Sequence, residues 1–104
     1  MYYDRNGKPI NRSEFAKRHD DFEYKVLART TLPDGRFVST VWLGIDHAFG
    51  EQPPLIFETM VFPERGNWHE EDCDRYATEA EARAGHEAMV AKWSAPKASG
   101  FEFL

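Results

Sequence analysis

The chain has little of what marks a secreted, membrane-spanning or zinc-binding protein. It contains one cysteine, Cys73, among 104 residues, which excludes an internal disulfide framework and any zinc site that takes two cysteines from one chain. No apolar run approaches the roughly 20 residues of a membrane-spanning helix, and the opening MYYDRNGKPI lacks the pattern of a signal peptide. We therefore expect a cytoplasmic protein that does not enter a membrane.

Excess basic charge is also lacking. The chain has 13 Lys and Arg against 18 Asp and Glu, a net charge of −5, and residues 64–87 hold eight acids and three bases. An acidic chain does not offer the basic surface that neutralises phosphates, so we expect no direct nucleic-acid binding. The acidic stretch is most simply a solvated face; the alternative is a surface that mimics nucleic acid.

The motifs of common enzyme classes are absent. The seven glycines are scattered as turn residues, without a phosphate-binding loop or a dinucleotide fingerprint. Cys73 stands among acidic residues, which disfavour the thiolate and so a nucleophilic role. We expect no cofactor, and the sequence leans away from an enzyme.

Two strongly apolar runs form the centre of the sequence. Residues 36–46 and 55–62 are rich in β-branched and aromatic side chains, which favour strands. Both runs are apolar at odd and even positions, as in strands that are covered on both faces. They are therefore predicted to be the central strands of a sheet.

Shorter elements are predicted around this centre. Residues 22–31 alternate in polarity as a strand does, and the Pro33-Asp34-Gly35 turn joins them to the next strand in a hairpin. Residues 74–77 favour a further short strand. Thr78 and Glu81 have the spacing of a capping box at the start of a helix that runs to about Trp93.

The predicted fold is a single α+β domain over residues 1–104. Residues 1–21 form an N-terminal arm with an Asn-Gly hairpin and a short helix. Asn11 or Ser13 is expected to cap this helix, and Glu14 would complete a capping box with Asn11. Residues 22–77 form an antiparallel meander of three or four strands. Residues 78–93 form a helix packed on one face, and residues 94–104 form a tail. One helix covers one face of a small sheet, so we expect the other face to bind a partner or a second copy of the chain.

The candidate binding residues lie on the two central strands, in the loop between them and on the helix: Trp42, Asp46, His47, Phe49, Glu58 and His86. Asp46, His47 and His86 would suit a divalent metal if the helix crossed that end of the sheet. No metal-binding spacing supports this set, and Asp46 capping its own loop is the simpler interpretation.

Two of these residues have structural interpretations as well. His86 is interpreted as a histidine at the core edge, bonded to a backbone carbonyl, with Gly85 letting the helix approach a large side chain such as Trp42. Glu58 lies on an apolar strand face and needs a partner such as an Arg, Tyr or His, because an unpaired buried carboxylate is costly. A general acid is the alternative for Glu58, although no second carboxylate is in register with it.

The strings STVWLGIDHAFG, PPLIFETMVF and DRYATEAEARAGHEAMV, with the opening YYDRNGKPI, resemble a group of small uncharacterised proteins. This group occurs in tailed bacteriophages and in actinobacterial and other bacterial genomes, in many cases as prophage genes. The resemblance implies a small accessory protein of a bacterial cell or a phage-infected host, and it implies no activity.

Two classes of function remain open from the sequence. The favoured one is a non-enzymatic protein–protein interaction module, indicated by the small size, the many aromatic residues and the lack of a catalytic constellation. The alternative is a small metal- or ligand-binding domain that uses Asp46, His47 and His86.

Overall fold

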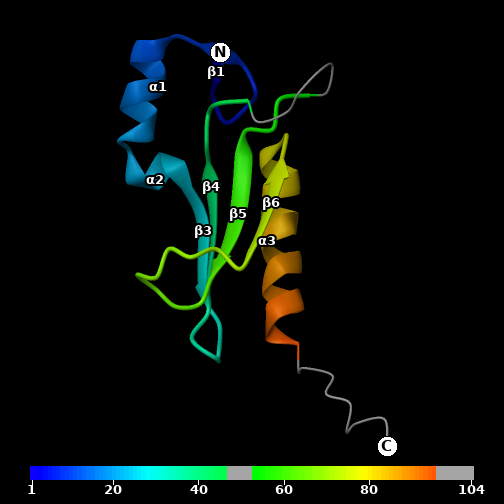
Figure 1. Ribbon diagram of the computed structural model, residues 1–104. Helices are drawn as coiled ribbons and strands as arrows, with labels where there is room; N and C mark the ends of the chain where they lie inside the picture. Colours follow the sequence, from blue (N-terminus) through cyan, green and yellow to red (C-terminus); the bar gives the residue numbers. More distant parts are fainter. Residues whose placement is uncertain (47–52, 96–104) are drawn as a thin grey trace, which may run out of the picture.

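A four-stranded antiparallel sheet forms the body of the protein. The computed structural model describes residues 1–46 and 53–95, and it orders the strands β3 (Val26–Thr31), β4 (Phe37–Trp42), β5 (Phe57–Phe62) and β6 (Asp72–Tyr76) as a meander (Figure 1). The long helix α3 (Glu79–Ser94) lies along one face. The predicted α+β fold is therefore confirmed.

The N-terminal arm consists of two short strands and two short helices. Strands β1 (Tyr2–Tyr3) and β2 (Pro9–Ile10) pair as an antiparallel hairpin, followed by α1 (Arg12–His19) and α2 (Phe22–Lys25). Asn11 and Glu14 complete the predicted capping box, in which each side chain accepts a hydrogen bond from the other residue's backbone N–H. The arm therefore begins as the sequence indicates.

The strand predicted to start at Phe22 is wrong in its first four residues. Phe22–Lys25 is a helical turn, because the Asp21 side chain accepts hydrogen bonds from the backbone N–H groups of Glu23 and Tyr24. A local helix cap of this kind overrides the alternating polarity of the first four residues. The turn brings the Tyr24 ring edge-on to Trp42, with the ring centroids 5.1 Å apart.

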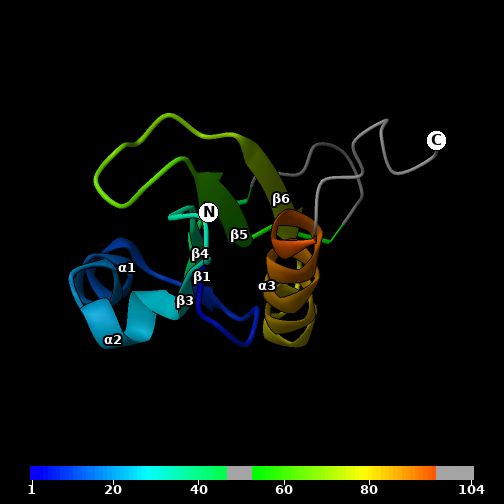
Figure 2. The ribbon, with the colours of Figure 1, turned by 90° about the horizontal axis from the view of Figure 1, so that it is seen from below.

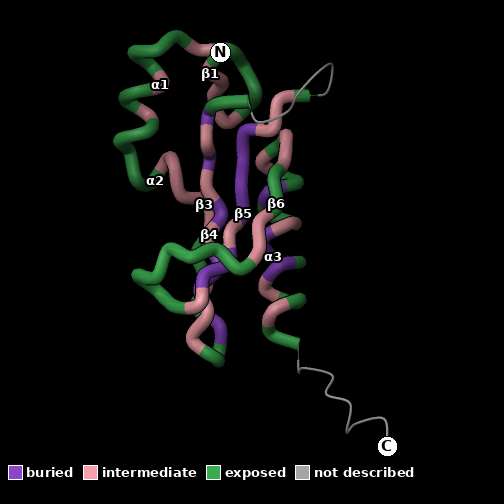
Figure 3. Tube along the Cα trace, viewed as in Figure 1, coloured by how far each residue is buried: buried purple, intermediate pink, exposed green. Residues whose placement is uncertain are grey.

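The face of the sheet beneath α3 carries the core (Figure 3). Facing pairs from β4 and β5 are all fully buried there: Val38 with Val61, Thr40 with Thr59, and Trp42 with Phe57. Helix α3 contributes Ala82, His86 and Met89. The predicted second strand starts at Phe57 rather than Leu55, and Ile56 joins Trp42 and Ala82 in this core instead of facing the other side with Glu58.

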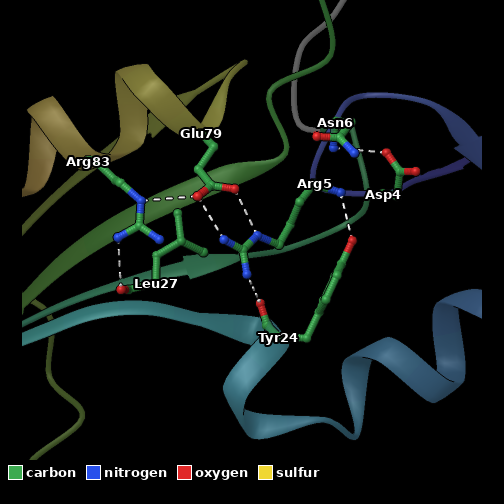
Figure 4. A network of polar contacts seen from close by, with 7 residues as sticks. All are labelled: Asp4, Arg5, Asn6, Tyr24, Leu27, Glu79 and Arg83. Carbon is green, nitrogen blue, oxygen red and sulfur yellow. Dashed lines mark hydrogen bonds and ion pairs between the residues drawn. The ribbon is translucent and has the colours of Figure 1, made fainter.

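A network of ion pairs and hydrogen bonds connects the N-terminal arm to α3 (Figure 4). The Arg5 guanidinium donates two hydrogen bonds to the Glu79 carboxylate, at 2.9 and 2.7 Å, and one to the Tyr24 carbonyl. Arg83 also donates to Glu79 and reaches the Leu27 carbonyl. Hydrogen bonds from the two arginines lower the pKa of Glu79, so the carboxylate stays charged well into the acidic range.

The β3–β4 hairpin turns at Gly35, whose φ of +95° lies in the left-handed region. An added Cβ at Gly35 would meet nothing within 4 Å, so strain at this position comes from the backbone alone. Gly35→Val is therefore expected to lower the free energy of unfolding by more than about 1 kcal/mol. Gly35→Asn is the control, because asparagine tolerates this conformation; equal melting temperatures for wild type and Gly35→Val would contradict the turn.

Candidate functional site

His86 lies in a buried network of hydroxyl groups that spans three strands. Its Nε2 is 2.8 Å from the Thr30 hydroxyl of β3, and its Nδ1 is 2.7 Å from the Thr40 hydroxyl of β4. Thr40 in turn contacts the Thr59 hydroxyl of β5 at 2.5 Å. A neutral imidazole has one donor and one acceptor nitrogen, so one threonine accepts from His86 and the other donates to it.

The predicted surroundings of His86 are therefore wrong in three details. The ring is only 2% exposed, not at the core edge, and its partners are hydroxyls, not a backbone carbonyl. Gly85 accommodates Tyr76 rather than Trp42, since an added Cβ would overlap the Tyr76 ring and hydroxyl. That phenol is buried without a hydrogen-bond partner of good geometry, and its burial raises the pKa of Tyr76.

This geometry excludes His86 as a ligand of the proposed divalent-metal site. Both of its ring nitrogens already bind threonine hydroxyls, so neither offers a free lone pair to a cation. Asp46 accepts a hydrogen bond from the Leu55 backbone N–H at 3.0 Å, which closes its own loop as the structural interpretation predicts. His47 and Phe49 lie outside the described residues. Within residues 1–46 and 53–95, no three potential ligands gather in a metal-binding group.

Trp42 and Glu58 both have structural partners. Trp42 is completely buried, and its indole N–H donates to the Tyr3 carbonyl at 3.0 Å, so this predicted binding residue belongs to the core. Glu58, which is also buried, accepts a hydrogen bond from Arg75 Nε at 2.9 Å across the β5–β6 pair. The predicted arginine partner of Glu58 is thus present, and the ion pair accounts for a buried carboxylate without a catalytic role.

Cys73 is poorly suited to nucleophilic chemistry. Burial, together with the nearby Glu58 carboxylate, raises the pKa of the Cys73 thiol to about 11. Because the thiolate is the reactive species, a thiol with this pKa is almost entirely protonated at neutral pH. This agrees with the sequence interpretation of Cys73 as unreactive.

The buried imidazole makes stability depend on pH. Burial lowers the pKa of His86 below its ordinary value of 6.5; Glu87 opposes this shift, Arg83 adds to it, and the strands present only hydroxyls. The unfolded chain therefore takes up a proton at higher pH than the folded chain. Stability due to neutral His86 is fully present above about pH 6.5 and is lost as the pH falls toward the folded pKa.

Urea unfolding at about pH 7.5 and pH 5.5 measures this effect. The wild type is expected to be less stable at the lower pH, by an amount that depends on how far folding lowers the pKa of His86. His86→Gln keeps a donor and an acceptor but does not titrate, so the loss between these two pH values is expected to shrink in that variant. An identical loss in both proteins would contradict the assignment to His86.

The face of the sheet opposite α3 carries no helix among the described residues. The arm packs its aromatic residues against Trp42, on the same side as α3. Figure 2 shows the loop between β5 and β6 on the other side of the sheet from α3. On this face the register places Phe37 beside Phe62, Ser39 beside Met60, and Val41 beside Glu58. Phe37, Phe62 and Glu58 are nevertheless buried.

One end of the face opposite α3 carries an arginine–aromatic patch, made of Phe22, Arg29, Phe37, Phe62, Arg65 and Trp68. The Arg29 guanidinium lies over the Phe22 and Phe37 rings, with its carbon 5.3 and 5.1 Å from their centroids, and Arg65 lies over Phe37 at 5.0 Å. Trp68 stands edge-on to Phe62 at 5.2 Å. Phe22 is 60% exposed and Trp68 is 68% exposed, so the patch presents two aromatic rings to solvent.

Sequence patterns alone do not predict this patch. They place Phe22 in a strand and Trp68 in a polar loop, and the two residues are far apart in the chain. The sequence nevertheless contains one signal for the patch. In a hairpin, an arginine two positions before the end of the first strand lies on the same face as an aromatic residue that begins the second strand. Arg29 and Phe37 have this relation, but only the β3–β4 register reveals it.

A pocket in the described part of the chain lies elsewhere, at the end of α3. It has a volume of about 630 Å³ and is open to solvent, and its lining includes Asp34, Arg36, Lys92 and Trp93. Its charges are already paired: Arg36 binds Asp34 and Glu71, and Lys92 binds Asp72. The pocket therefore offers no unpaired charge to orient a ligand.

The geometry defines a small α+β domain whose sheet is covered by helices on one face, and no helix in the described ranges is long and apolar enough to cross a membrane. Comparisons with protein-family models, with curated proteins and with solved structures found no match. The resemblance to phage and bacterial accessory proteins therefore stays a prediction.

Proposed function

We propose that this protein is a non-enzymatic interaction module that binds another protein through the arginine–aromatic patch, on the side of its sheet opposite α3. The observation that carries the proposal is the arginine–aromatic patch, where Phe22 and Trp68 stand exposed beside two stacked arginines. Aromatic residues and arginine are the residue types that contribute most to protein–protein binding energy. A cytoplasmic accessory role in a bacterial or phage-infected cell belongs to the same proposal.

The other candidate functions have less support. The metal-binding alternative needs His86, whose nitrogens bind threonines. A nucleic-acid mimic needs an array of free carboxylates, but several acids of the 64–87 stretch are paired: Glu71 with Arg36, Asp72 with Lys92, and Glu79 with two arginines. Protein binding requires neither a group of metal ligands nor an array of free carboxylates. A second copy of the chain is one protein that this face could bind.

Site-specific photocrosslinking in cells that produce the protein tests the proposal. A crosslinking amino acid is placed at His69, beside the exposed Trp68, and in a matched variant at Ala91, on the exposed side of α3. We expect a protein adduct at His69 that is lost when Trp68→Ala is added, and no such adduct at Ala91. Equal adducts at both positions, or none at His69, would overturn the proposal.

A further inference from the structure

We infer that the arginine–aromatic patch takes a carboxylate-rich, extended segment of the partner protein. This inference rests on the proposed function and names the chemistry of its partner. Arg29 and Arg65 would bind two carboxylates, and Trp68 would pack against an apolar side chain next to them. Arginine binds carboxylates with particular strength because its planar guanidinium forms paired, charge-assisted hydrogen bonds.

The two arginines differ from most others in the chain by lacking a carboxylate partner. Five arginines form ion pairs with Asp or Glu: Arg5, Arg18, Arg36, Arg75 and Arg83. Within the described residues, Arg29 and Arg65 form none and contact aromatic rings instead. In a chain with net charge −5, two unpaired arginines that contact the same Phe37 ring make a local site for an anionic group.

The spacing of the two guanidinium groups suits an extended peptide. Both lie over the Phe37 ring, at 5.1 and 5.0 Å from its centroid, so their carbons are no more than about 10 Å apart. Side chains two positions apart on an extended strand point the same way and are about 7 Å apart. Acidic residues at alternating positions can therefore reach both arginines. Ring stacking holds each guanidinium in place and leaves its N–H edge for a ligand.

A second copy and a nucleic acid fit this patch less well. A two-fold contact of the patch with itself would bring four arginines together without an added negative charge. A nucleic-acid strand continues beyond the patch with one charge per nucleotide, and the adjoining loop carries Glu64 and Glu70. These carboxylates would repel a long phosphate backbone more than a short acidic segment, which carries fewer charges.

Selection from a library of displayed random peptides on the immobilised protein tests the inference. We expect enriched peptides with Asp or Glu at alternating positions next to an apolar residue. Binding of a synthesised peptide should weaken about ten- to a hundredfold in Arg29→Gln/Arg65→Gln. It should be unchanged in Arg12→Gln, an exposed arginine of α1 that also lacks an ion pair in the described structure, and it should weaken with added salt.

Other outcomes would overturn the inference: no enrichment, enriched peptides without acidic residues, or equal affinity in the double variant. A mass near twice 12.1 kDa by light scattering would point to a second copy, and tighter binding of oligothymidylate than of any peptide would point to nucleic acid. If crosslinking at His69 still depends on Trp68 while the arginine variants change nothing, the interaction module stands and only the acidic chemistry fails.

Discussion

Replacing His86 with alanine is expected to lower the free energy of unfolding by about 2–4 kcal/mol. The variant loses a fully buried ring, which leaves a cavity between α3 and the sheet. It also leaves the Thr30 hydroxyl and one hydrogen bond of Thr40 without a partner in the core. An unsatisfied buried polar group adds its desolvation cost to that of the cavity.

Urea unfolding of three variants separates these contributions. Thr30→Val removes one hydroxyl partner but keeps the volume of the side chain, and we expect it to cost less than His86→Ala. His86→Gln keeps a donor and an acceptor in a smaller side chain, and it should fall between them. A loss below about 1 kcal/mol for His86→Ala would contradict the buried network, because exposed polar substitutions have effects of about that size or less.

Gly85→Ala is expected to destabilise the fold by about 1–3 kcal/mol, although alanine is the better helix former. The added methyl group would overlap the Tyr76 ring and hydroxyl, which pack against the helix at this point. The ring is rigid and its hydroxyl is buried, so relief requires either the helix or strand β6 to shift. The gain in helix propensity, about 1 kcal/mol, is smaller than the expected cost.

A double-mutant cycle with Tyr76→Leu identifies the cause. Leucine is shorter than tyrosine and leaves space above Gly85, so Gly85→Ala is expected to be neutral or stabilising in the Tyr76→Leu background. Ala84→Gly is a control for helix propensity, since Ala84 is exposed on the same turn. If Gly85→Ala were as costly in the Tyr76→Leu background as in the wild type, contact with the ring could not be the reason.

Much of the fold could be predicted because local signals agree with the final structure. The Asn11–Glu14 capping box, the turn at Gly35 and the Thr78 cap each depend on residues close in sequence, and all three are present. The central strands follow from their β-branched and aromatic residues. The start of β3 could not be predicted, because a helical turn capped by Asp21 has the same four-residue pattern as a strand.

The candidate site was harder to predict, because it depends on contacts between distant residues. His86 gains its partners from the strands of the sheet, and the sequence does not specify which threonines point toward α3. Glu58 was the exception: a carboxylate in an apolar run needs a cation, and the β5–β6 register supplies Arg75. The arginine–aromatic patch combines residues from a helix, three strands and a loop, so only the tertiary fold reveals it.

The central claim is that the arginine–aromatic patch binds an acidic segment of a partner, and an NMR titration tests it most directly. The isotopically labelled protein is titrated with the acidic peptide that the displayed library yields. The largest shifts are predicted at the Arg29 and Phe37 amides and at the Trp68 indole. Shifts centred instead on the exposed side of α3, around Glu87 and Ala91, would contradict the account.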